Sequence, residues 1–307
     1  MSSQLETLGH EERSRSYDPA APLTPSGNLR RRQLFSRLTE QLATAAAIAA
    51  IAVLVIVVYS VIARGAGAIS WDFITKSAPV GVAPALVGSA IIVAIGTLIA
   101  TPIGILIGLF LTEYAGGRTA ALVSLTMDVM NGLPAIIIGL FIFTLLVSVK
   151  GTFGLGQSAY AAGVALSIIM LPLIARGTQG VLRLIPKGQS EAADALGVAR
   201  WRTVLSVILP SALGGILTVT ILSVARAAGE TAPVLLVSSI GPIDHVSLNP
   251  FEAIANSPTR IYTLSEEANP AGFTEAWGLS LLLISFILFA SLGARALLAR
   301  SKGKRSS

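Results

Sequence analysis

Three charged residues lie inside long apolar stretches of the sequence, and they are the clearest candidates for chemistry. They are Asp128, Arg226 and Glu230. A charge at membrane depth is costly and usually serves a function there. Arg226 and Glu230 are four residues apart, which on a helix places them on one face and within reach of each other. Because the guanidinium fork of arginine suits an oxyanion, the pair indicates either an anion-binding group on a transport path or a structural ion pair.

The other polar candidates have weaker arguments. Asp128 falls near the middle of its apolar stretch, where helix packing or gating is the expected role. Arg176 ends another apolar stretch. It could either contact an anion or anchor the helix at the membrane boundary.

Motifs that would make the chain an enzyme are missing. There is no cysteine, and His10 and His245 have no paired spacing for a metal. The Gly- and Lys-containing loop of P-loop ATPases is absent, as are a nucleophile elbow and a catalytic carboxylate pair. We therefore expect a non-catalytic chain without a metal site or cofactor of its own.

The elements that carry these residues are expected to cross a membrane. The chain has 307 residues, of which 53% are hydrophobic and only 12% are charged. A soluble domain has about a quarter of its residues charged. A helix that crosses the hydrocarbon core needs about 20 apolar residues. Six stretches reach that length, which predicts an all-α membrane protein: 42–63, 83–111, 119–149, 158–176, 211–239 and 276–299.

Three of these stretches contain residues that interrupt helices. The second carries Pro102, the third carries Pro134, and the fifth carries Gly229 and Pro233. Lipid cannot satisfy the backbone groups that a break exposes, so breaks are tolerated where protein or a water-filled cavity supplies partners. The pattern favours a protein-lined pathway, although kinked packing helices would also explain it. Glycines at four-residue spacing, as at 104 and 108, would let helices approach closely.

The distribution of Lys and Arg sets the expected topology. With the N-terminus inside, seventeen of the 22 basic residues fall in inner segments and four in outer loops. This bias predicts that both termini are cytoplasmic, and it explains the net charge of +6 without nucleic-acid binding. We expect a disordered tail and juxtamembrane helix over 1–41, a transmembrane domain over 42–299 and a basic cytoplasmic tail over 300–307.

The long inner segment 177–210 has a distinctive pattern. An Ala-rich helix with favourable acidic residues near its start is expected from about Ser190, and Gly197 permits a sharp turn. A second amphipathic segment then returns to the membrane at Pro210. On pattern alone this could be a pair of interfacial helices.

The same segment resembles the Glu-Ala-Ala loop of the permease subunits of bacterial ATP-binding-cassette importers. Glu191, Gly197 and Leu209-Pro210 fit that pattern, while Val207 stands where Ile is common. The resemblance implies the type I importer permease fold with six membrane helices. It also implies that a cytoplasmic helix-turn-helix docks on a separate ATPase, which binds the ATP. The residues it assigns to docking are Glu191, Ala192, Ala193, Leu196 and Gly197.

A second resemblance narrows the family. The stretch from Ala225 to Pro233 is similar to the Ala-Arg-Ala-x-Gly-Glu-Thr-Ala-Pro segment of phosphate-importer permeases. The runs 131–141, 256–262 and 275–277 resemble PstA-type subunits in particular, with Ala135 in place of the usual Ser. The resemblance covers about residues 40–300, and it implies that Arg226 and Glu230 contribute to phosphate passage.

The resemblance also implies partners. These are a second, similar permease subunit, two copies of a cytoplasmic ATPase and an extracytoplasmic phosphate-binding protein, assembled in the lipid of the bacterial inner membrane. The outer segment 241–275 carries five carboxylates against one arginine. The field of these charges would repel free phosphate. Such an acidic surface is easier to understand if a binding protein docks there and delivers the ion.

Other functions remain open. The chain could carry another oxyanion, such as phosphonate, sulfate or molybdate. A secondary transporter or channel acting alone would need matched breaks in inverted repeats, and no convincing internal repeat is found. A purely structural anchor would not need Arg226 or the interrupted stretches.

Overall fold

The computed structural model describes residues 29–148, 153–154, 156–186, 188–239, 241–267 and 269–303. Every regular element within these ranges is a helix, as expected for an all-α protein. The chain divides into two compact units, residues 1–58 and 59–307. Most of the predicted N-terminal tail and part of the C-terminal tail lie outside the described residues.

The first unit contributes the greater part of α2 (Leu29–Gly65). The helix starts well before the predicted span, because the polar residues 29–41 continue the same helix into the apolar run. At 37 residues it is longer than the roughly 20 residues that a crossing needs.

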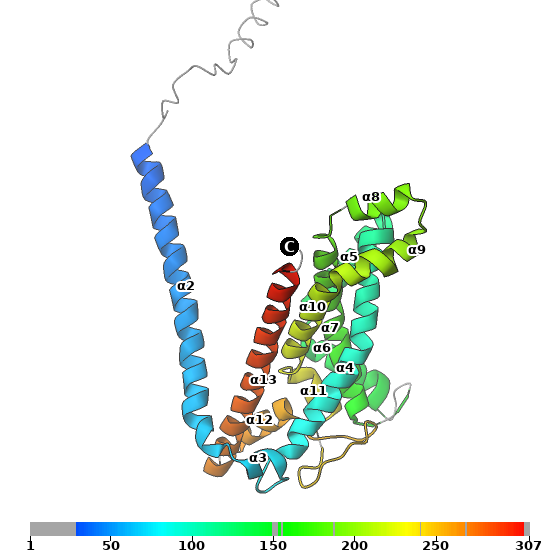
Figure 1. The fold of residues 1–307 in the computed structure, drawn as a ribbon. Coiled ribbons are helices and arrows are strands. Elements are labelled where there is room, and N and C mark those ends of the chain that lie inside the picture. The colour runs from blue at the N-terminus through cyan, green and yellow to red at the C-terminus, as the bar shows by residue number, and fades with distance from the viewer. Residues whose placement is uncertain are drawn as a thin grey trace, which may run out of the picture. The chain divides into compact units, whose positions relative to one another are not determined.

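The second unit holds the remaining spans (Figure 1). Its long helices are α4 (Ala83–Leu109), α7 (Ala159–Leu182), α10 (Leu209–Ala227) and α13 (Pro270–Gly303). Together with α2, five described helices are long and apolar enough to cross a membrane. A bent pair, α5 (Gly117–Gly132) and α6 (Ala135–Ile142), raises the number to six when it is counted as one crossing. The six predicted stretches are therefore found.

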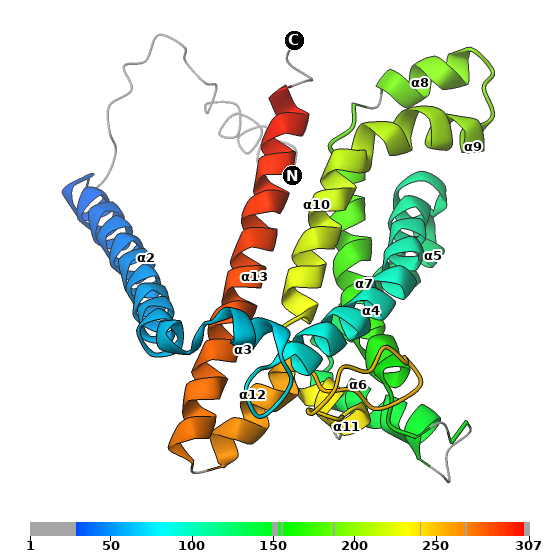
Figure 2. The same cartoon turned by 60° about the horizontal axis from the view of Figure 1, so that its bottom comes forward.

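Helix α7 lies at the centre of this unit and packs along α4 (Figure 2). The contact depends on small residues: a Cβ on Gly104 would lie 2.8 Å from Ile174, and one on Gly108 would lie 2.7 Å from Thr178. The expected close approach at these glycines is confirmed. The expected interruption at Pro102 is wrong, because α4 continues through it; a proline costs one hydrogen bond, and neighbouring helices can compensate for it.

Two crossings are discontinuous. Helices α5 and α6 meet at a bend of 97°, with Pro134 directly before α6, and a π-helical turn, η4 (Phe143–Val147), follows α6. Helix α10 ends at Ala227, and α11 (Ala232–Val237) starts after four intervening residues. Helices α6 and α11 contact each other where a Cβ on Gly139 would lie 2.6 Å from the Cα of Pro233. The two interruptions are thus packed together.

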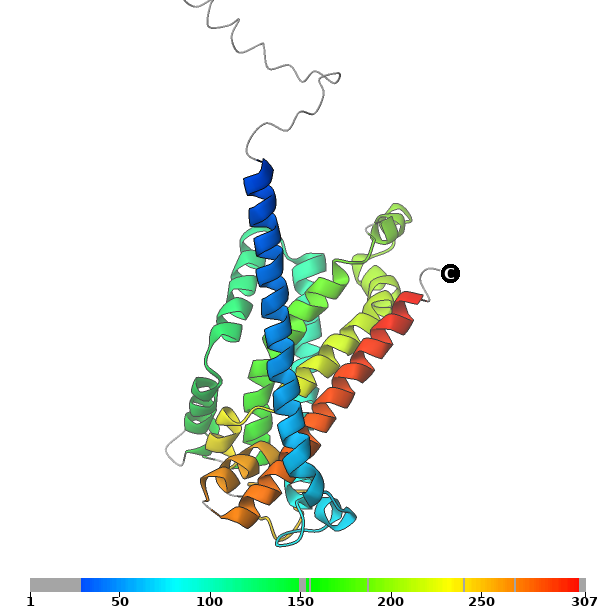
Figure 3. The same ribbon diagram turned by 90° about the vertical axis from the view of Figure 1, so that its left-hand side faces the viewer.

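The short elements gather at the two ends of the bundle. One end carries η2 (Ala66–Ala68), α3 (Trp71–Thr75), α11 and α12 (Ser257–Glu266). The opposite end carries α8 (Gly188–Ala195) and α9 (Arg200–Thr203), as Figures 1 and 3 show. Figure 3 also shows α13 running beside α10, with which it packs. A π-helical turn, η5 (Val204–Ile208), joins α9 to α10 without a break.

Candidate functional site

The segment between α7 and α10 forms a helix-turn-helix at one end of the molecule. Its first helix, α8, ends in a turn where Gly197 has φ +70°, a left-handed conformation that disfavours other residues. The backbone N–H of Gly197 donates to the carbonyl of Asp194, and that of Val198 donates to the carbonyl of Ala193, which caps the end of the helix. The segment is shorter than the predicted 177–210, because α7 continues to Leu182.

Apolar side chains are exposed on this segment. Leu196 is 81% exposed at the turn, and Trp201 and Leu205 are each 56% exposed on the returning helix. None of the residues of α8 is buried, including Glu191, Ala192 and Ala193. Exposed apolar groups gathered at a tip are typical of an interaction surface. We call this surface, formed by residues 188–205, the tip.

Arg200 connects the tip with the end of α4. Arg200 donates through Nη1 to Asp194 at 3.2 Å and through Nη2 to Glu113 at 3.0 Å. Asp194 belongs to α8, whereas Glu113 lies in η3 (Phe110–Tyr114), the π-helical turn that ends α4. Three helices of different position in the sequence therefore meet at one guanidinium.

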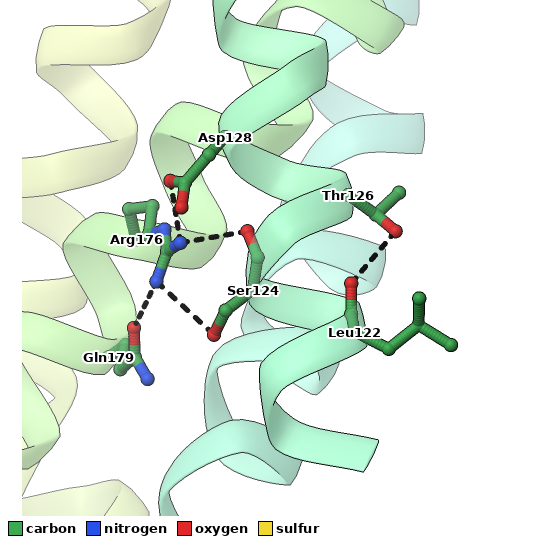
Figure 4. Close-up of polar contacts among 6 residues, drawn as sticks. All are labelled: Leu122, Ser124, Thr126, Asp128, Arg176 and Gln179. Atoms are coloured by element: carbon green, nitrogen blue, oxygen red, sulfur yellow. Dashed lines mark hydrogen bonds and ion pairs between the residues drawn. The ribbon is translucent and has the colours of Figure 1, made fainter. Parts of the chain in front are cut away.

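Asp128 and Arg176 are brought together, as Figure 4 shows. Nη2 of Arg176, on α7, lies 2.5 Å from Oδ1 of Asp128 on α5 and donates to the carbonyl of Ser124 at 2.8 Å. Nη1 donates to Oε1 of Gln179 at 3.1 Å. The Asp128 side chain is 64% exposed and that of Arg176 is 33% exposed. The cluster therefore holds a charged pair at a partly open surface of this chain.

Arg226 and Glu230 do not lie on one helix. Arg226 is exposed in the last turn of α10, and Glu230 follows the end of that helix at Ala227. Among the described residues these two form no ion pair with each other, so the predicted pairing is absent. The reason is local: the backbone turns at Ala228 and Gly229 before α11 starts, and helical i, i+4 spacing no longer holds.

The interruption between α5 and α6 is open to the surroundings of the chain. Asn131, Gly132, Leu133 and Pro134 are all exposed, one turn after Asp128. In lipid, free backbone groups at such a break would lack partners. Asp128 and this break share one exposed region, which is consequently unsuited to contact hydrocarbon alone.

The opposite end of the molecule presents acidic groups and internal pairs. Arg260 makes a two-pronged contact with Glu275, at 2.9 and 3.1 Å. Hydrogen bonds from its own backbone and from the His245 ring hold the pKa of Asp244 below its ordinary value. The Tyr262 hydroxyl donates to Glu266, which raises the pKa of that tyrosine. A hollow of about 540 Å³ beside Arg260 and Glu275 opens on this end.

Sequence reasoning did not find the contacts of Arg176 and Arg200. Nothing in the spacing relates Arg200 to Glu113, which is 87 positions away. The unusual feature was Glu113 itself, a carboxylate next to an apolar run. In the part of the chain that the structure describes, no group of three potential metal ligands occurs.

Known proteins are similar in sequence to this chain over most of its length. A family model described as the binding-protein-dependent transport system inner membrane component matches residues 100–302. The phosphate transport system permease protein PstA of Xylella fastidiosa (strain 9a5c) is 38% identical over 249 residues, 79% of this chain and 85% of that protein. PstA 1 of Mycobacterium tuberculosis (strain H37Rv) is 37% identical over 215 residues, 70% and 68% of the two chains.

Solved structures support the same fold. A chain of the MetNI methionine transporter superposes with a TM-score of 0.53 at 22% identity, covering 75% of this chain and 96% of that one. A chain of a bacterial alginate transporter gives 0.61 at 14% identity, covering 86% and 98%. The helix order, the tip and the family match agree, and the expected type I importer permease fold is confirmed. This chain belongs to the family of binding-protein-dependent transport system inner membrane components.

Proposed function

We propose that this chain is the permease subunit of an ATP-driven importer that carries inorganic phosphate across the bacterial inner membrane by alternating access. The assignment of phosphate as the cargo rests on the 38% identity to a phosphate permease over 249 residues. The chain is the membrane part of the machine, and hydrolysis of ATP belongs to a separate subunit.

The tip is the docking element for that ATPase. Its exposed Leu196 and the slim Ala192–Ala193 surface can enter a groove on a partner, and the left-handed turn at Gly197 sets the angle between its helices. Glu191 lies in the first turn of α8, where a carboxylate stabilises the helix. Two ATPase copies serve the two permease subunits, one at each tip.

A second, similar permease subunit covers the exposed region around Asp128. A carboxylate and an open backbone break at membrane depth are both costly against lipid. Protein or a water-filled path between two subunits removes that cost. We place the transport path along this region, between α5, α6 and the partner.

The fixed positive charges act on the passing phosphate. Arg176 has donors on two nitrogens and is held by Asp128 and Gln179, so an arriving anion competes with Asp128 for the guanidinium. Arg226 is exposed beside the helix break at Gly229, with Glu230 following. It supplies a second contact, and the breaks at Pro134, Gly229 and Pro233 provide the flexible points of the path.

In this proposal the tip lies in the cytoplasm. Arg183, Arg200 and Arg202 lie at that end, and the basic bias of inner segments assigns it to the inside. Both termini are then cytoplasmic. The acidic opposite end faces outward, where a phosphate-binding protein docks and releases its ion.

Uptake of radiolabelled phosphate by phosphate-starved cells tests this proposal. A strain deleted for the gene should lose high-affinity uptake, and the wild-type gene should restore it. Sulfate, molybdate and phosphonate uptake are measured in parallel. Normal phosphate uptake in a deletion strain without a second importer, combined with loss of another oxyanion, would assign the permease to that oxyanion instead.

A further inference from the structure

Helix α8 has little apolar attachment to the rest of the molecule. None of its residues is buried, and a hollow of about 270 Å³ lies between it, the end of α7 and the end of α4. Apolar packing normally fixes a short helix, because eight residues are too few for independent stability. Another interaction must therefore hold α8 in place.

The far side of the tip is anchored differently. Val204 and Ile208, in η5, are buried against Leu109 and Leu182. This apolar cluster fixes the point where the tip rejoins the membrane helices. A force applied at α8 would bend the tip about this point unless α8 had a second connection to the bundle.

Arg200 makes that second connection. One of its nitrogens binds Asp194 on α8, and another binds Glu113 at the end of α4. The Glu113 side chain is only 10% exposed, so water screens its side of the contact poorly, whereas Arg200 and Asp194 are 41% and 50% exposed. The nearly buried Glu113 is therefore the fixed anchor for Arg200, and the exposed Asp194 connects Arg200 to α8.

We infer that Arg200 is a positioning residue that ties the tip to α4, so that the two move as one body when the ATPase closes. The inference rests on the proposed coupling role of the tip. Helix α4 packs along α7, which carries Arg176. Motion at α8 therefore reaches the charged cluster on the transport path through Arg200, Glu113 and the α4–α7 contact.

The test measures the number of phosphate ions imported per ATP hydrolysed, in proteoliposomes that hold the complete transporter. The variants are Glu113→Gln, Arg200→Gln and the double variant, with assembly verified by gel filtration. Each single change should lower the ratio by about 5-fold, and the double change should be no worse than either single change, as for two residues acting through one contact. Arg118→Gln is the control, since Arg118 is an exposed arginine in the first turn of α5, outside the tip.

A cross-link distinguishes a fixed tie from a contact that must open. The chain contains no cysteine, so Glu113→Cys with Arg200→Cys gives one reactive pair when the partner subunits are also cysteine-free. Before cross-linking this variant should be uncoupled. A short bismaleimide bridge should raise its ratio towards that of the wild type.

Two results would overturn the inference: unchanged coupling in both single variants, or a bridged pair that stays uncoupled although the bridge is complete. Failure of the phosphate assignment would give a different result, because wild-type proteoliposomes would then import no phosphate. In that case the tie is tested by how far the binding protein stimulates ATP hydrolysis. Loss of that stimulation in Arg200→Gln but not in Arg118→Gln supports the tie, and equal stimulation in both refutes it.

Discussion

Nη2 of Arg176 lies 2.5 Å from Oδ1 of Asp128, and this contact joins the most buried helix of the bundle to the helix that bends by 97° one turn later. The carbonyl of Ser124 accepts from the same nitrogen and Gln179 from the other. Arg176 is consequently held in one orientation by three neighbours. A guanidinium with fixed geometry is suited to receive an anion, because less conformational freedom is lost on binding.

Changing Arg176 should impair transport more than stability. Arg176→Gln removes the charge that we propose for phosphate, and uptake should fall by about 10-fold or more, the cost of losing hydrogen bonds to a charged group. Arg176→Lys keeps the charge but loses the fork, so it should retain an intermediate rate. Initial rates of phosphate uptake across a concentration series check both.

Arg118→Gln serves as the control for Arg176, because Arg118 is an exposed residue in the first turn of α5. It should transport normally. If Arg176→Gln lowers the melting temperature together with uptake, and Arg176→Lys is fully active, Arg176 would have a structural role alone.

Arg226 and Glu230 should respond independently to substitution. Since no ion pair joins them in the described chain, Glu230→Gln should leave the thermal stability of the complex unaltered, whereas Arg226→Ala should abolish phosphate uptake without loss of assembly. The measurements are uptake and the midpoint of thermal unfolding in detergent. Unimpaired uptake by Arg226→Ala would remove this residue from the path.

Gly197→Val should disconnect the permease from its ATPase. A β-branched residue in the left-handed conformation costs about 1–2 kcal/mol, so the turn should rearrange and displace α8. The protein should still insert, but co-purification of the ATPase and uptake should both decline. Gly188→Ala, at the start of the same helix and with open space around its Cβ, should behave as wild type; similar binding by Gly197→Val would argue against docking through this turn.

Gly108→Ala should loosen the contact between α4 and α7. The added Cβ would lie 2.7 Å from Thr178 and 3.0 Å from the carbonyl of Ala175, so the helices must separate, at a cost of about 1–3 kcal/mol. Gly180→Ala, on α7 with nothing near its Cβ, should be neutral or slightly stabilising. Thermal unfolding of the two variants checks the difference, and equal midpoints would contradict the packing.

Hydropathy and motif spacing predicted the number of crossings and the tip, because apolar length and turn chemistry are local properties. They misplaced the end of α7 at Arg176. Hydropathy treats a polar residue as a boundary. Arg176 instead finds partners in Asp128 and the Ser124 carbonyl of α5 and in Gln179 of its own helix, so α7 continues.

The side-chain partners in the candidate sites could not be predicted. Arg200 and Glu113 meet only because α4 ends beside α9, and that depends on how the whole bundle packs. Conversely, the spacing of Arg226 and Glu230 suggested a pair, but helical periodicity applies only while the helix lasts, and α10 ends between them.

The contact of Gly139 with Pro233 has a consequence for the number of ways in which the protein can move. In the proposed transport cycle each interrupted crossing serves as a hinge, and two separate hinges could flex in any combination. With no space for even a methyl group between them, one hinge cannot rotate without displacing the other. We therefore expect the two hinges to move together as a single joint, which would disfavour states that are open to both sides of the membrane at once.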